Sequence, residues 1–157
     1  MHAGKDREKM IIETKYLGKM EIDKANIIFF ESGLPGFKDE NKFVILDIPE
    51  NEVMQILQSV NTPHLAFIVT NPHYFYKEYE FELDEPIVES LQITDKNQIV
   101  ILTIMTIHDP FHTSTINLQA PLIINSKTKR AKQYILPNEA YDVKATISLP
   151  ARNEKGV

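Results

Sequence analysis

The chain contains no cysteine and only five glycines among its 157 residues. The absence of cysteine excludes disulfide bonds, a cysteine-ligated zinc ion and a thiol nucleophile, and it is compatible with a reducing compartment. With so few glycines, the chain has no glycine-rich loop of the kind that cradles phosphates. These absences exclude thiol-dependent enzymes, nucleotide-binding proteins with a glycine-rich phosphate loop, and small secreted domains held together by disulfide bonds.

A long apolar run is also missing. The longest, residues 99–102 with Ile104, Met105 and Ile107 just after, is far too short to span a bilayer. The first nine residues carry charges of both signs and have no apolar core behind them, so they do not form a secretory signal. We therefore expect a cytoplasmic protein that does not bind membranes.

The composition fits one folded domain. Hydrophobic residues make up 43% of the chain and charged residues 25%, close to globular averages, so we expect no cofactor to be needed for folding or function. No internal repeat and no linker is apparent. We expect residues 1–9 to be a disordered or non-native tail, residues 10–149 a single domain and residues 150–157 a flexible C-terminal tail.

Short runs of β-branched and aromatic residues, each closed by glycine, proline, asparagine or aspartate, dominate the chain. They predict strands at residues 10–14, 20–23, 27–30, 43–46, 53–60, 65–70, 79–83 and 99–107, and a hairpin of residues 115–125 with 131–136. Strict alternation in residues 79–83 indicates a strand buried on one face, whereas residues 99–107 indicate a central strand covered on both. We expect a mostly β fold, a small antiparallel barrel-like or sandwich domain.

One stretch has the pattern of a short helix. Asp84 is suited to cap its N-terminus and Pro86 to occupy its first turn. Ile87, Val88 and Leu91 supply an apolar stripe that would face the rest of the domain.

Two segments resemble catalytic or metal-binding motifs only in part. His108 and His112 have the spacing that places two metal-binding imidazoles on one face of a helix, but Pro110 opposes a helix there. A strand-ending turn with solvated histidines is therefore expected, and no metal site. Residues 32–36 lack the glycine that precedes the serine of a nucleophile elbow. We expect a protein that binds other proteins and is not an enzyme.

The feature that stands out from background is acidic. Residues 78–95 contain no lysine or arginine but seven carboxylates, namely Glu78, Glu80, Glu82, Asp84, Glu85, Glu89 and Asp95. They form either a solvated strand face followed by an acid-favouring helix N-terminus, or a patch that steers a basic partner and raises its association rate. The net charge of −5 argues against direct nucleic-acid binding.

Three aromatic residues, Tyr74, Phe75 and Tyr76, precede the acidic run and follow Asn71 in one loop. One interpretation is that they cap a barrel. The other is that they anchor an interface, because tyrosine and phenylalanine bury a large area at low entropic cost. The sequence leaves both open.

Three segments taken together resemble the FliW family of flagellar assembly factors. They are residues 32–37 (SGLPGF), 63–72 (PHLAFIVTNP) and 117–125 (NLQAPLIIN), in that order along most of the chain. The resemblance implies a bacterial, cytoplasmic, non-enzymatic regulator with a compact β-barrel-like fold. It further implies two partners, flagellin awaiting export and the translational repressor CsrA. Free of flagellin, such a protein binds CsrA and relieves repression of flagellin mRNA translation.

A CsrA-type repressor binds RNA and so carries basic surface, which the acidic run complements. The candidate partner-binding residues are Asn71, Tyr74, Phe75, Tyr76, Glu78, Glu80, Glu82, Asp84 and Glu85. We expect a monomer when the protein is free. Two alternatives are a ligand-binding or hydrolytic small barrel with a cavity near His64, His73 and His108, and a subunit whose edge strand at residues 79–83 pairs with a neighbour.

Overall fold

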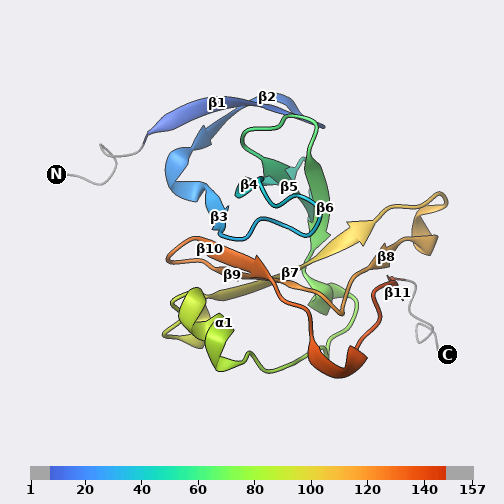
Figure 1. The fold of residues 1–157 in the computed structure, drawn as a ribbon. Helices are drawn as coiled ribbons and strands as arrows, with labels where there is room; N and C mark the ends of the chain where they lie inside the picture. Colours follow the sequence, from blue (N-terminus) through green and yellow to red (C-terminus); the bar gives the residue numbers. More distant parts are fainter. Residues whose placement is uncertain (1–7, 148–157) are drawn as a thin grey trace.

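Seven strands close into a β-barrel in the computed structural model, which describes residues 8–147 (Figure 1). The mostly β fold predicted from the sequence is confirmed, and the barrel is the form it takes. Strand β1 starts at Lys9, one residue before the expected start of the domain. Of the two expected tails, residues 1–9 and 150–157, all but residues 8 and 9 lie outside the described residues, as do residues 148 and 149 of the expected domain.

Eleven strands and one α-helix are present among residues 8–147. The strands are β1 (Lys9–Thr14), β2 (Gly18–Asp23), β3 (Ile28–Phe30), β4 (Lys42–Ile48), β5 (Asn51–Ser59), β6 (Ala66–Thr70), β7 (Ile99–Thr106), β8 (Thr115–Ile116), β9 (Leu122–Asn125), β10 (Arg130–Gln133) and β11 (Ala145–Thr146). The helices are α1 (Glu85–Ser90) and the 3-10 turns η2 (Lys24–Asn26), η3 (Pro72–Tyr74), η4 (Lys96–Gln98), η5 (Phe111–Thr113) and η6 (Pro137–Glu139). No helix in this part of the chain is long and apolar enough to cross a membrane.

The barrel runs in the order β7-β6-β5-β4-β3-β10-β9 and closes because β9 pairs with β7. Six of these pairings are antiparallel, but β3 and β10 are parallel, which corrects the expectation of a purely antiparallel domain. The reason is geometric: strands that alternate in direction around a closed ring must be even in number, so a ring of seven needs a parallel pair. Strands β8 and β11 extend the sheet beyond β7.

The barrel interior is filled with apolar side chains. Each of the seven strands contributes at least one, and the cluster consists of Ile28, Phe30, Leu34, Phe43, Leu57, Leu65, Val69, Leu102, Leu122, Ile124 and Ala131. Phe30 and Phe43 are completely buried and meet edge to face, with ring centroids 5.5 Å apart. Burial of this kind is the main favourable contribution to folding.

Two elements cover the outside of the barrel. The β1–β2 hairpin packs Ile12 and Ile22 against the outer faces of β4 and β5. At the opposite end of the molecule lies α1 (Figure 1), and its Ile87 and the C-cap residue Leu91 pack against Ile123 of β9. Asp84 caps this helix as expected, since its Oδ1 accepts a hydrogen bond from the Ile87 N–H at 3.1 Å.

The prediction of a strand at residues 79–83 is wrong. Its side chains do alternate, with Tyr79 buried and Glu80 and Glu82 exposed, but no strand among residues 8–147 pairs with it. The reason is that Tyr141, from the C-terminal part of the domain, hydrogen-bonds with the Glu80 backbone where a partner strand would lie. Alternation reports which side chains are buried, and it does not report whether the backbone has a partner.

The predicted strand at residues 115–125 is also interrupted. The Asn117 side chain accepts hydrogen bonds from the N–H groups of Gln119 and Ala120, which turns the chain between β8 and β9. The hairpin that follows is formed by β9 and β10, so the expected pairing is correct over a shorter length.

Candidate protein-binding site

The candidate residues lie on one segment, residues 71–85, which leaves the end of β6 and enters α1. Asn71 starts the 3-10 turn η3, because its Oδ1 accepts a hydrogen bond from the His73 N–H at 2.9 Å. The His73 imidazole in turn lies 2.9 Å, through Nε2, from the Tyr79 carbonyl oxygen. These contacts fold the first half of the segment onto itself and fix the direction of the second half.

The three aromatic residues of this segment differ in exposure. Tyr74 is 54% exposed, and its hydroxyl donates to the Glu52 carbonyl oxygen at 3.1 Å. Phe75 and Tyr76 are half-buried in the cluster around Tyr79, and the Tyr76 hydroxyl donates to the Thr146 carbonyl oxygen. Phe75 and Tyr76 therefore pack in a cluster that is separate from the barrel interior, whereas Tyr74 presents most of its ring to solvent.

Tyr79 holds the centre of the segment. It is buried, its hydroxyl donates to the Leu118 carbonyl oxygen at 2.6 Å, and its ring lies 4.7 Å from that of Tyr141. Burial raises the pKa of Tyr79 above its ordinary value, and the neighbouring Tyr141 adds to the effect. Burial, with a smaller contribution from Asp142, also raises the pKa of Tyr76. Both phenols therefore stay protonated at neutral pH and act as hydrogen-bond donors.

All seven carboxylates of the acidic run are exposed, and no ion pair within residues 8–147 involves any of them. Asp84 is engaged in capping α1 and accepts a hydrogen bond from the Tyr134 hydroxyl at 3.4 Å, and Asp95 caps η4. The side chains without a partner in the described part of the chain are Glu78, Glu80, Glu82, Glu85 and Glu89. Their charges are thus available to a partner and are not neutralised within the domain.

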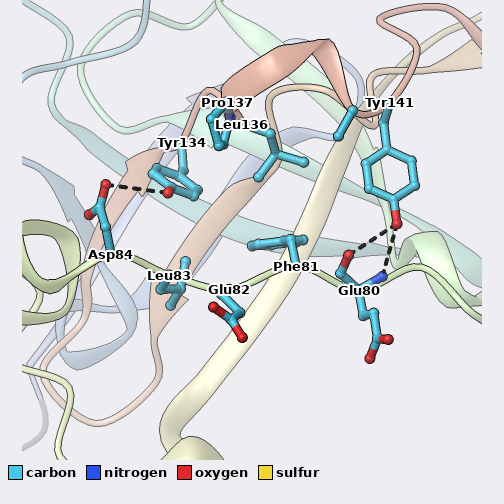
Figure 2. Close-up of a pocket in the computed structure, with 10 residues that line it drawn as sticks. Glu80, Phe81, Glu82, Leu83, Asp84, Tyr134, Leu136, Pro137 and Tyr141 are labelled. Carbon is cyan, nitrogen blue, oxygen red and sulfur yellow. Dashed lines mark hydrogen bonds between the residues drawn. The ribbon is translucent and has the colours of Figure 1, made fainter.

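Two grooves run beside these carboxylates. The larger, of about 670 Å³, has residues 80–84 on one side and Tyr134, Leu136, Pro137 and Tyr141 on the other (Figure 2). The second, of about 450 Å³, lies between residues 74–79 and Tyr141 and is mostly apolar. Since Tyr141 borders both, the grooves are adjacent and follow the candidate segment. Both volumes are in the range of ligand sites, although the grooves are open to solvent.

The far wall of the larger groove was not foreseen from the sequence. Tyr134 and Tyr141 bond with Asp84 and Glu80, which lie 50 and 61 residues away along the chain. No local pattern marks these tyrosines as part of a site. Only the closure of the barrel and the course of the chain after β10 bring them beside residues 80–84 (Figure 2).

The three histidines of the alternative site do not converge. His73 borders an open pocket of about 500 Å³ with Lys77, Glu78, Tyr79 and Glu80, but His64 and His108 border neither that pocket nor the two grooves. The barrel interior, which the alternative of a ligand-binding barrel would need to be hollow, is filled with apolar side chains. Within residues 8–147 no group of three or more His, Asp or Glu side chains is placed to hold a metal ion.

Comparison with known proteins matches the FliW protein family over residues 9–147. A flagellar assembly factor FliW of Oceanobacillus iheyensis is 50% identical over 145 residues, which is 92% of this chain and 99% of that protein. The FliW of Bacillus subtilis is 48% identical over 138 residues, 88% of this chain and 96% of that protein. A crystal structure of a flagellar assembly factor FliW superposes with a TM-score of 0.85 at 41% identity, covering 90% of this chain and 99% of that one.

These matches agree with the resemblance carried by the three sequence segments and with the barrel described above. They cover the strands of the barrel, the acidic run and both walls of the larger groove. The chain therefore belongs to the FliW family of flagellar assembly factors, proteins that are not enzymes.

Proposed function

We propose that the protein binds flagellin in the cytoplasm and, when free of flagellin, binds and antagonises the translational repressor CsrA. Antagonism of CsrA relieves repression of flagellin mRNA translation, so synthesis of flagellin follows its export. Residues 71–85 are the CsrA-binding face in this proposal, with Tyr74 as an aromatic anchor and Glu78, Glu80, Glu82 and Glu85 as charged contacts.

One observation carries the proposed binding face. The net charge of this protein is only −5, yet one segment beside the two grooves carries several exposed carboxylates. None of them forms an ion pair within the described residues. A repressor that binds RNA needs basic surface for the phosphates, and an acidic face is complementary to such a surface. Charges of this kind chiefly raise the association rate, and salt screens them beyond about 8 Å at physiological ionic strength.

Charge reversal tests this face. The triple variant Glu80→Lys, Glu82→Lys, Glu85→Lys should slow CsrA association about ten-fold at low salt and flatten its salt dependence. The measurement is stopped-flow kinetics with purified CsrA over a range of salt concentrations. The matched control reverses Glu13, Glu21 and Asp39, exposed acids outside the proposed face, and so changes the net charge equally. If CsrA association slowed equally in both variants, the net charge of the protein would be the cause, and the proposal for this face would be wrong.

Exclusive binding of the two partners is the second part of the proposal. If each complex has nanomolar affinity, each corresponds to about −12 kcal/mol, and the relative amounts of free flagellin and CsrA decide which complex forms. Size-exclusion chromatography with light scattering on the three-component mixture should show two binary complexes. A stable ternary complex would contradict partner exchange.

A further inference from the structure

We propose that the larger groove binds an extended segment of a partner protein as an added β-strand, in which apolar and basic side chains alternate. The proposal deepens the function proposed above, on which it rests for the location of the partner face. It assigns a binding mode, backbone pairing at Glu82, and a ligand chemistry to that face.

The backbone along one side of the groove is unpaired. The N–H and C=O groups of Phe81, Glu82 and Leu83 make no hydrogen bond within residues 8–147, although the segment has the side-chain alternation of a strand. Unpaired backbone groups of an extended segment are the usual template for addition of a strand from another chain.

The direction of these groups follows from Tyr141. Its hydroxyl bonds with both the N–H and the C=O of Glu80, so the Glu80 backbone faces the groove (Figure 2). In an extended chain the backbone groups of residues two positions apart point to the same edge. The N–H and C=O of Glu82 therefore face the groove as well, and an antiparallel strand lying there would exchange two hydrogen bonds with Glu82.

The side chains around the groove define the occupant. Glu80 and Glu82 are exposed and form no ion pair in the described part of the chain, so lysine or arginine on the neighbouring face of an added strand would complement them. Side chains on the other face would meet the apolar parts of Tyr134, Leu136 and Pro137. The complementary ligand is thus an extended segment that alternates apolar with basic residues.

The probe is a short synthetic peptide that alternates valine with lysine, blocked at both ends and labelled for fluorescence anisotropy. It should bind the full chain, and Glu82→Lys should weaken binding about five-fold, as expected for a reversed cross-strand charge pair. Glu89→Lys makes the same charge change in the acidic run outside the groove and should change binding less than about two-fold. A copy of the peptide that is N-methylated at alternate amides should bind about ten-fold more weakly, because it cannot pair with the backbone.

Amide hydrogen exchange gives a direct readout of the pairing. Bound peptide should slow exchange at the Glu82 N–H and leave that of Phe81, which points to the other edge, unchanged. No binding, equal binding of the N-methylated peptide, or equal weakening by Glu89→Lys would each overturn the proposal. Exchange that slows equally at both amides would do so too.

Failure of this inference is distinguishable from failure of the proposed function. If the peptide does not bind while reversal of Glu80, Glu82 and Glu85 still slows CsrA, the face is correct and strand addition is wrong. If the peptide binds as described but CsrA association is unaffected by saturating peptide, the groove is a strand-binding site and the CsrA face lies elsewhere.

Discussion

The hydroxyl of Tyr141 donates a hydrogen bond to the carbonyl oxygen of Glu80 at 3.0 Å and accepts one from the Glu80 N–H at 3.4 Å. A single side chain thus satisfies both backbone groups of a residue 61 positions away along the chain. Together with the contact between the Tyr141 and Tyr79 rings, it joins the acidic segment to the C-terminal part of the domain and sets the width of the larger groove at one end.

Removal of this hydroxyl should weaken the domain modestly. Tyr141→Phe keeps the ring packed on Tyr79 but leaves both Glu80 backbone groups without their partner, at a cost of about 1 kcal/mol in the free energy of unfolding. Urea denaturation measures the change. Tyr16→Phe is the control, because no hydrogen bond involves the Tyr16 hydroxyl within residues 8–147 and its ring is half-exposed. Equal losses in the two variants would mean that the Tyr141 contacts contribute nothing.

Alkaline pH should destabilise the protein through Tyr79. Its pKa is raised above the ordinary value of 10.0 in the folded state, because burial disfavours the charged phenolate. Above about pH 10 the unfolded chain has therefore released a proton that the folded chain keeps, and the free energy of unfolding falls as the pH rises further. Below pH 10 this contribution is fully present. Tyr76, whose pKa is raised mainly by burial, acts in the same direction.

The Tyr79→Phe variant separates the two roles of this side chain. At neutral pH the free energy of unfolding should be about 1 kcal/mol lower than that of the wild type, because the Leu118 carbonyl oxygen loses its hydrogen-bond donor. Between about pH 9 and about pH 11 its stability should fall less steeply than that of the wild type. Urea denaturation across this range gives both quantities. A slope identical to that of the wild type would show that Tyr79 is not the source of the alkaline sensitivity.

Most of the fold was predictable because strand runs and the helix cap are local signals. The six strands from β1 to β6 lie within a few residues of the predicted runs, and Asp84 caps α1 as its position indicated. The parallel pair of β3 and β10 was not predictable in this way, because it follows from how many strands the barrel closes with. Local patterns do not encode that number.

The candidate site was predictable on one side only. The carboxylates at residues 78–85 form a visible run in the sequence, and the structure leaves all of them exposed and without an ion pair in the described part of the chain. The opposite wall, Tyr134 and Tyr141, comes from a distant part of the chain, and two isolated tyrosines have no distinguishing spacing. Alternation at residues 79–83 predicts a strand, but no strand among residues 8–147 pairs with this segment, and the groove therefore has unpaired backbone along one side.

Asn125, the last residue of the segment at 117–125, should be among the most sensitive positions for stability. It is completely buried, and its Nδ2 donates to the carbonyl oxygens of Leu91 and Gln92 while its Oδ1 accepts from the N–H groups of Lys127 and Thr128. It thereby joins the end of α1 to the β9–β10 turn.

Asn125→Ala should lower the free energy of unfolding by about 3 kcal/mol, because several buried backbone groups lose their partners at once. Thermal and urea denaturation both measure this. The control Asn97→Ala changes an exposed asparagine whose side chain has no hydrogen bond within residues 8–147 and should be within about 0.5 kcal/mol of the wild type. A similarly small effect at Asn125 would contradict the bridging role.

Gly33 and Gly18 offer a matched test of the turn at residues 32–37. Both have positive φ, +66° and +70°, so alanine is strained at either position. They differ in surroundings: a Cβ at Gly33 would lie 2.5 Å from the Lys38 carbonyl oxygen and 2.6 Å from that of Phe37, whereas a Cβ at Gly18 would meet nothing within 4 Å.

Gly18→Ala should therefore cost about 1 kcal/mol, the conformational penalty alone. Gly33→Ala should cost about 3 kcal/mol or more, since the backbone of residues 37 and 38 must shift to relieve the contact and Leu34, which packs in the barrel interior, lies next to it. Urea denaturation of the two variants gives the difference directly. Equal losses of stability would show that residues 37 and 38 can shift at little cost. Their close approach to Gly33 would then not explain why this turn needs glycine.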